Sequence, residues 1–97
     1  MKTADLIGSA LDWAVASAEG VIYHGLAWAN YSTNWAQGGP IIEREGIRLH
    51  RSHTGEWWAG SEADPQRPVN GPTPLIAAMR CYVTSNLGND VNIPEVL

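Results

Sequence analysis

The sequence has a single cysteine, few basic residues and no long apolar run, and each shortage excludes a class of protein. Cys81 alone cannot form a disulfide within the chain, so the cross-links of a small secreted domain are absent. Six Lys and Arg residues against ten Asp and Glu give a net charge of -4, whereas binding long duplex DNA normally requires a basic face. No stretch approaches the roughly 18 apolar residues of a membrane span, and Asp5 stands where a signal peptide is apolar. We therefore expect a cytoplasmic protein whose partners include neither long nucleic acid nor a membrane.

Phenylalanine is also absent, but five tryptophans and three tyrosines replace it in a chain that is 44% hydrophobic. This composition is typical of a folded protein with amphipathic aromatic surface. A length of 97 residues suits one core only. We expect a single domain over residues 1–97.

An amphipathic helix is predicted over residues 4–19, with Thr3 as its N-cap and Gly20 just past its end. Asp5, Asp12 and Glu19 recur every seventh residue and should form an acidic, solvated stripe opposite the core face. The residues expected on the core face are Leu6, Ile7, Ala10, Leu11, Trp13, Ala14, Val15 and Ala18.

A second helix is predicted over residues 75–87, because Thr73 can cap it, Pro74 suits its first turn and Gly88 follows it. Its period separates two sets of residues. Leu75, Ile76, Met79, Tyr82, Val83 and Leu87 should pack on a sheet, whereas Ala77, Arg80, Cys81 and Thr84 fall outside that arc.

A β-hairpin is predicted between the helices. Residues 46–51 alternate apolar and polar side chains, residues 52–55 form the turn, and residues 56–59 return. Trp57 and Trp58 must then point to opposite faces of the sheet. Ile41-Ile42 and residues 91–93 are short candidates to extend it, and residues 61–72 are predicted to be a mobile surface loop. The fold class expected is α+β: a small antiparallel sheet with two helices packed on one face.

The segment from Asn30 to Arg48 is the candidate ligand site. We predict a long loop there, and core packing accounts for its residue types less well than for those of any other segment. Flat aromatic rings can stack on a base, amides can read its edge, and a Gly-Gly backbone can approach a phosphate. Arginines can supply bidentate phosphate contacts. In the alternative interpretation the aromatics cover the sheet edge, the glycines serve a turn and the arginines pair with Glu43, Glu45 or Glu56; a protein-binding surface is a third. The candidate residues are Tyr31, Ser32, Thr33, Asn34, Trp35, Gln37, Gly38, Gly39, Arg44, Arg48 and Arg80.

Catalytic and metal-binding patterns are not indicated. Gly38-Gly39 lacks the lysine and helix setting of a P-loop. The three histidines, His24, His50 and His53, have no metal-type spacing with Cys81. A triad of Ser32, His50 and Glu56 lacks a nucleophile elbow. We expect no catalytic residues, no metal and no cofactor.

Two stretches carry a family resemblance: Tyr31-Ser32-Thr33-Asn34-Trp35-Ala36-Gln37-Gly38-Gly39-Pro40-Ile41-Ile42-Glu43-Arg44-Glu45-Gly46-Ile47 and Gly71-Pro72-Thr73-Pro74-Leu75-Ile76-Ala77-Ala78-Met79-Arg80-Cys81-Tyr82. With Ala10-Leu11-Asp12-Trp13-Ala14-Val15-Ala16, they resemble the NinX-like family of lambdoid phages and prophages. The resemblance implies a phage early-region accessory protein in the host cytoplasm. It carries no assigned activity.

Two hypotheses follow, with an enzyme using Glu43 or Glu45 as base a distant third. The first is a non-enzymatic, homo-oligomeric binder that sequesters a small nucleotide-like host defence signal, with Trp35 in the ligand site. The second is an inhibitor that docks on a host protein through an exposed Trp of the Trp57-Trp58 pair and the acidic stripe.

Overall fold

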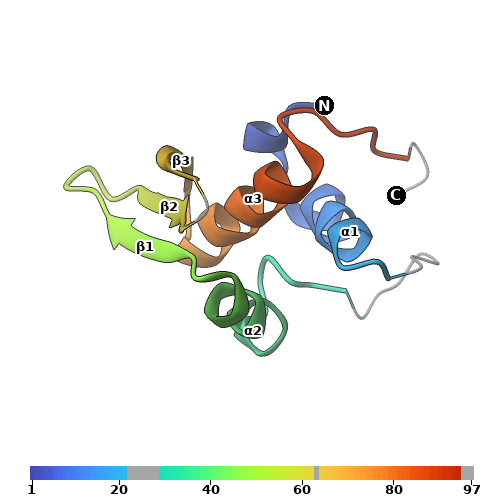
Figure 1. The fold of residues 1–97 in the computed structure, drawn as a ribbon, viewed down its shortest axis with the longest axis horizontal. Coiled ribbons are helices and arrows are strands. Elements are labelled where there is room, and N and C mark those ends of the chain that lie inside the picture. The colour runs from blue at the N-terminus through green and yellow to red at the C-terminus, as the bar shows by residue number, and fades with distance from the viewer. Residues whose placement is uncertain (22–28, 63, 95–97) are drawn as a thin grey trace.

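The computed structural model describes residues 1–21, 29–62 and 64–94. Within the described residues, short helices precede a three-stranded antiparallel sheet and one α-helix follows it (Figure 1). In chain order the elements are a 3-10 helix η1 (Thr3–Asp5), α1 (Gly8–Ala18), α2 (Trp35–Glu45), β1 (Arg48–Arg51), β2 (Trp57–Ser61), β3 (Asp64–Gly71) and α3 (Pro74–Leu87).

The sheet has the order β1-β2-β3, so β1 and β3 are its edges. The predicted hairpin is confirmed, with Arg51 opposite Trp57 and Leu49 opposite Ala59. Ala59 is buried and Trp57 packs against the core. Because neighbouring side chains alternate between faces, Trp58 lies on the outer face of the sheet.

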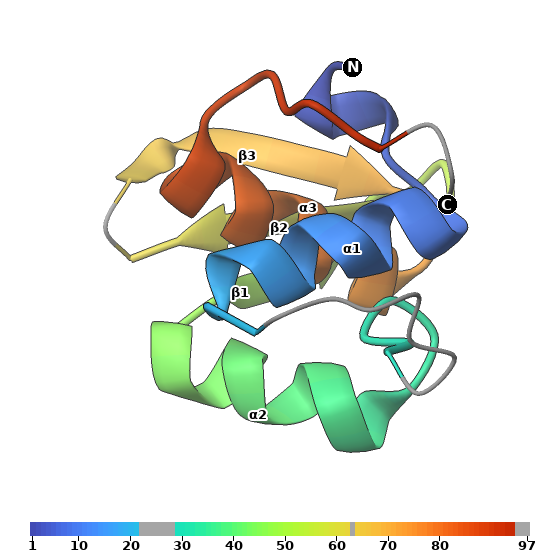
Figure 2. The same cartoon turned by 90° about the vertical axis from the view of Figure 1, so that its right-hand side faces the viewer.

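Helix α3 lies at the centre of the molecule. The sheet packs on one side of it, α1 packs on the other and α2 runs beside it (Figures 1 and 2). The α+β class is therefore confirmed, with all three α-helices of the described residues on the same side of the sheet. Helix α1 contributes to the core mainly through α3, which separates it from the strands.

The ends of α3 agree with the prediction. The Thr73 Oγ1 atom accepts a hydrogen bond from the Ile76 N–H at 3.1 Å, Pro74 is the first helical residue and Gly88 terminates the helix. The set of α3 residues predicted to be buried was too small, because α3 is covered on two sides and Ala77 and Cys81 are buried as well. Leu87, which was predicted to pack on the sheet, is exposed. Neither α3 nor any other helix in the described ranges is long and apolar enough to cross a membrane.

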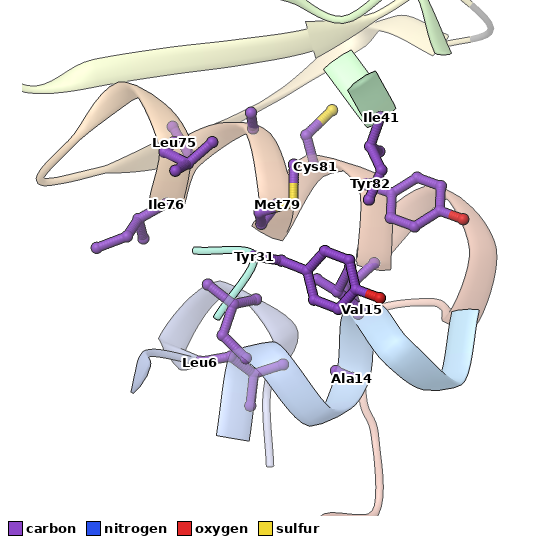
Figure 3. Packing of buried hydrophobic residues seen from close by; sticks show 14 of the residues in the cluster. Leu6, Ala14, Val15, Tyr31, Ile41, Leu75, Ile76, Met79, Cys81 and Tyr82 are labelled. Carbon is purple, nitrogen blue, oxygen red and sulfur yellow. The ribbon is translucent and has the colours of Figure 1, made fainter. Parts of the chain in front are cut away.

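The core gathers around α3, as Figure 3 shows. Helix α1 faces it from below in this view, and Tyr31 enters between the two helices. Ile7, which was predicted to face the core, is 55% exposed, and Trp13 is half-buried at the rim. The buried apolar residues labelled there are Leu6, Ala14, Val15, Tyr31, Ile41, Leu75, Ile76, Met79, Cys81 and Tyr82.

The start of α1 was predicted four residues too early, because Thr3 has a different partner. Thr3 lies in η1, and its Oγ1 donates a hydrogen bond to the Gly88 carbonyl at 2.7 Å. The N-terminal segment pairs with the segment after α3: Lys2 bridges to Asp90, and the Val91 N–H donates to the Met1 carbonyl at 3.0 Å. Residues 91–93 therefore do not extend the sheet as predicted.

The predicted loop from Asn30 to Arg48 is wrong over most of its length, because residues 35–45 form α2. Ile41 and Ile42 belong to this helix and not to a strand. Gly46, at φ 64°, terminates it in a left-handed conformation. Gly38 allows α2 to approach its neighbours, since a Cβ there would lie 2.6 Å from both Leu75 Cδ1 and the Tyr31 carbonyl oxygen.

The predicted loop over residues 61–72 is also wrong, because Asp64–Gly71 form β3. Proline lacks the N–H that a central strand needs, which is why the segment reads as a loop. β3 is an edge strand with one side unpaired, and Pro65 and Pro68 are tolerated there.

Candidate functional site

The first candidate residues, Tyr31 and Ser32, are part of the interior. Ser32 is 1% exposed, and both its N–H and its Oγ hydroxyl donate hydrogen bonds of 2.8 Å to Asp12 Oδ1. Asp12 is only 6% exposed, so the prediction of a solvated stripe is wrong at this residue. Tyr31 is buried in the core, and burial raises the pKa of its hydroxyl. This pair of residues fixes the chain to α1 before α2 begins.

The amides of the segment serve α2 itself. Asn34 is the N-cap, with its Oδ1 accepting from the Ala36 N–H at 2.9 Å, and Gln37 Oε1 accepts from the Asn30 N–H at 2.8 Å. Gly38 and Gly39 lie inside the helix, where their backbone forms no phosphate-binding loop. The exposed Thr33 remains at the surface.

Arg44 joins three helices. Its Nη1 and Nη2 atoms donate to the two carboxylate oxygens of Glu19 at 3.1 and 2.7 Å, and its Nε donates to Glu45 at 2.7 Å. Tyr82 donates its hydroxyl to Glu19 and lies under the guanidinium. Arg44 lowers the pKa of Glu19 and Glu19 raises that of Arg44, while burial raises the pKa of Tyr82 to about 12. The pairing of Arg44 with Glu45 agrees with one part of the alternative interpretation, in which the arginines pair with nearby acids, whereas Gly38 and Gly39 lie in a helix and serve no turn. Glu19 is an ion-pair partner of Arg44 and not a free acid of the stripe.

The other two arginines lie elsewhere. Arg80 donates from Nε to the Leu6 carbonyl at 2.8 Å and from Nη1 to the Asn70 carbonyl at 3.0 Å, and burial lowers its pKa. Arg48 is exposed on β1, opposite Gly60 and therefore on the outer face of the sheet. Arg44 and Arg80 are each held by internal partners, so the three arginines do not form one phosphate cradle.

Trp35 is the aromatic candidate that internal packing does not explain, since Tyr31 is buried. It is 53% exposed at the start of α2 and borders a shallow hollow of about 240 Å³. The starts of α2 and α3 meet at this end of the molecule (Figure 2). We call it the Trp35 hollow; its lining is Ser32, Thr33, Trp35, Thr73, Pro74, Leu75 and Ile76.

A larger hollow, of about 590 Å³, lies along the unpaired edge of β3 and was missed by the sequence analysis. We call it the β3-edge hollow. The Trp57-Trp58 pair indicates from the sequence that one indole lies outside the core. Lys2 and Asn89 reach the hollow because the N-terminal segment pairs with the segment after α3, and no pattern in the sequence predicts that pairing. Its lining is Lys2, Ala4, Trp58, Pro68, Val69, Asn70, Thr84, Asn89 and Asp90.

The β3-edge hollow combines several kinds of recognition group. Trp58 supplies an aromatic surface and Lys2 an exposed ammonium group. Asn70 donates through Nδ2 to Glu56 Oε2 at 3.1 Å, which directs its amide plane, and its Oδ1 is an additional acceptor. The carboxylate of Asp90 lies 4.0 Å from the N-terminal ammonium of Met1. Such a set suits a ligand with a flat ring, hydrogen-bonding edges and an anionic group.

The histidines give no metal centre in the part of the chain that is described. His50 and His53 are exposed on β1 and the hairpin turn, and His24 lies outside the described residues. No three His, Cys, Asp or Glu residues within the described ranges lie together as metal ligands would.

These features define a class: a small α+β domain built on one central helix, with the β3-edge hollow and the Trp35 hollow among the depressions of its described surface. The chain belongs to the family described as "Bacteriophage P22, NinX", which matches residues 2–86. The match includes both stretches that carry the resemblance and confirms it. No curated protein matches the chain.

Proposed function

We propose that this NinX-family phage protein is a non-enzymatic binder of a small nucleotide-like ligand, held in the β3-edge hollow, and that it sequesters a host defence signal of this kind. The observation that carries the proposal is the coincidence of an indole, an ammonium group and two carboxamides around about 590 Å³. Ligand pockets in proteins typically measure about 300 to 1,000 Å³ and combine apolar walls with a few polar groups. The Trp35 hollow, at about 240 Å³, falls below this range.

Each group has a role that its chemistry suggests. The indole of Trp58 stacks on a nucleobase, since every base presents a π-face. The carboxamides of Asn70 and Asn89 hydrogen-bond its edge, because an amide both donates and accepts. Lys2 provides the charge for a phosphate. The described lining includes one carboxylate, Asp90, and no histidine, which supports binding without turnover.

The sequestration part of the proposal is supported by membership of a phage family and by a site lining that suits binding without turnover. A phage accessory protein acts in the host cytoplasm, and a binder without turnover removes a signal in proportion to its own concentration. The competing hypothesis of a host-protein inhibitor relied on the acidic stripe. That stripe is interrupted, because Asp12 is buried and Glu19 is paired with Arg44.

The first experiment is isothermal titration calorimetry with cyclic dinucleotides, cyclic ADP-ribose isomers and adenine nucleotides. We expect Trp58→Ala to weaken binding by roughly fivefold to over a hundredfold, the usual cost of losing a base-stacking aromatic. Lys2→Ala should lower the affinity for phosphorylated ligands and leave the affinity for the parent nucleosides unchanged. Trp35→Ala is the matched control, since it removes an exposed tryptophan from the other hollow.

Each outcome has a clear meaning. If no ligand of the panel binds, the proposal is lost. If Trp35→Ala abolishes binding and Trp58→Ala does not, the ligand lies where the sequence analysis placed it, and the β3-edge hollow is not the site. Mass spectrometry of the ligand after denaturation of the complex tests turnover, because an enzyme would release a changed molecule.

A further inference from the structure

The outer face of the sheet continues from the ligand site toward β1. All three α-helices of the described residues lie on the inner side of the sheet (Figures 1 and 2). Cross-strand pairing places His50 and Asn70 on either side of Trp58, in one row across the three strands. Arg48 follows in the next row, opposite Gly60. Trp58, which lines the β3-edge hollow, therefore stands between that hollow and a second set of side chains on β1.

β1 and the turn after it carry a concentration of basic side chains. The chain has six Lys and Arg residues and three His residues, and four of these nine lie within residues 48–53, although the net charge is -4. Arg48 and His50 are exposed, and neither side chain has a hydrogen bond or an ion pair with another described residue. Within the same ranges, the carboxylate of Glu62 lies against Gly46 and makes no ion pair with Arg48. An anion bound at this place would therefore meet cations that have no internal partner.

We propose that Arg48 and His50 form a second phosphate subsite, and that the ligand is a dinucleotide with one phosphate on each side of the nucleoside that stacks on Trp58. This inference rests on the proposed function, since it uses the same stacking residue.

The positions of the cations select this class of ligand. Lys2 lies on the β3 side of Trp58, and Arg48 lies on the β1 side. Neighbouring strands are about 4.8 Å apart, so β1 and β3 are separated by roughly 10 Å. A nucleoside mono-, di- or triphosphate carries its charge at one end of the nucleoside and can satisfy only one side. A dinucleotide, linear with a 5′-phosphate or cyclic, has a phosphate at both ends of one nucleoside and can satisfy both.

The strand surface next to Trp58 leaves room for the ligand to cross. Gly60 is the residue of β2 that lies opposite Arg48. A Cβ atom at this glycine would meet no heavy atom within 4 Å, and its φ angle is not positive, so a side chain fits there without strain. The second nucleoside can therefore lie over this bare backbone, beside the guanidinium group of Arg48. A side chain added at position 60 would occupy that space, and it would leave the β3-edge hollow intact because Gly60 does not line it.

The test is isothermal titration calorimetry of the full chain with AMP and with the linear dinucleotide pApA, at about 0.15 M salt so that long-range attraction is screened. We expect pApA to bind at least about tenfold more tightly than AMP, the effect of one additional charged hydrogen-bonding contact. Arg48→Ala should remove this preference and change the affinity for AMP by less than about twofold, as expected of a distant site. Arg51→Ala is the matched control, because Arg51 is an exposed arginine of the same strand that lies opposite Trp57, on the other face of the sheet.

A second variant tests the subsite by filling it. Gly60→Val adds a side chain that suits a strand, so it should keep the circular dichroism spectrum and the affinity for AMP while the preference for pApA is lost.

The outcomes separate this inference from the proposed function. If AMP binds through Trp58 and Lys2 but pApA binds no more tightly, the second subsite is overturned and the proposed function stands. The same holds if Arg48→Ala and Gly60→Val leave the preference for pApA unchanged. Equal losses in Arg48→Ala and Arg51→Ala also overturn the subsite, because general attraction of charge then explains the preference. If neither ligand nor any other of the panel binds, both proposals are lost.

Discussion

Replacing Asp12 by alanine tests the internal connection between α1 and the segment that precedes α2. Asp12 Oδ1 accepts two hydrogen bonds from Ser32, one from its N–H and one from its hydroxyl, and both residues are buried. In Asp12→Ala the two donors remain without this acceptor. An unsatisfied buried donor costs about 1 to 3 kcal/mol, and removal of a buried carboxylate returns part of that cost. We therefore expect the free energy of unfolding to fall by about 2 to 4 kcal/mol.

This is a large share of the roughly 5 to 15 kcal/mol that stabilises a domain of this size, and the melting temperature should fall by about 8 °C or more. Urea unfolding followed by circular dichroism measures it. The control is Asp5→Ala, since Asp5 belongs to the same predicted stripe but is exposed, and its change should stay within about 0.5 kcal/mol. In the Ser32→Ala background, Asp12→Ala should cost less, because only the N–H is left unpaired. If Asp12→Ala unfolds no more easily than Asp5→Ala, the two hydrogen bonds do not stabilise the fold and this reasoning is refuted.

Three further changes test the contacts of α2. Gly38→Ala should destabilise the protein by about 1 to 3 kcal/mol, because the new Cβ would overlap Leu75 Cδ1 and also the Tyr31 carbonyl oxygen, a backbone atom that cannot move aside as a side chain can. Gly39→Ala has room for its Cβ and should gain up to about 1 kcal/mol of helix propensity. Thermal melts that rank the two variants in the opposite order would contradict the packing of α2. Arg44→Gln should lower stability near neutral pH by about 1 to 2 kcal/mol, a modest figure because Arg44 is half-exposed. The pKa of Glu19 is lowered in the folded protein, so its stabilising contribution is present above its ordinary value of 4.5 and is lost as the pH falls below it. Unfolding curves from pH 6 to 3 should therefore converge for wild type and Arg44→Gln, and a constant gap would show that the ion pair is not the cause.

Local signals predicted the parts of the fold that local chemistry determines. The start of α3 depends on the Thr73 hydroxyl and Pro74, and its end on Gly88, so one or two residues at each boundary fix it. The hairpin follows from alternation over a few residues. Both depend on interactions between residues close in the chain, which is what a sequence shows directly.

The failures have a common physical cause in contacts between distant residues. Gly38 looks like a turn residue, but it serves the approach of α2 to Leu75. Pro40 lies inside α2, although proline there costs a helix about 3 kcal/mol in isolation, because packing of the neighbouring Ile41 offsets it. Asp12 looks like a surface acid until its Ser32 partner is known. Of the candidate site, the exposure of Trp35 and the pairing of Arg44 with the adjacent Glu45 were foreseeable, whereas the Glu19 partner of Arg44 comes from a distant part of the chain.

The central position of α3 has a consequence for synthesis. The sheet and α1 both pack on α3, which begins only at Pro74. The first 73 residues are therefore synthesised before the helix that covers the apolar faces of α1 and the sheet. At about 5 to 20 residues per second, synthesis of these residues takes roughly 4 to 15 seconds. During that interval the apolar faces of α1 and the hairpin are exposed, so chaperones can bind them and the chain can aggregate through them. A ribosome stalled before α3 should therefore carry a protease-sensitive chain, and resistance should arise abruptly once this helix is outside the tunnel.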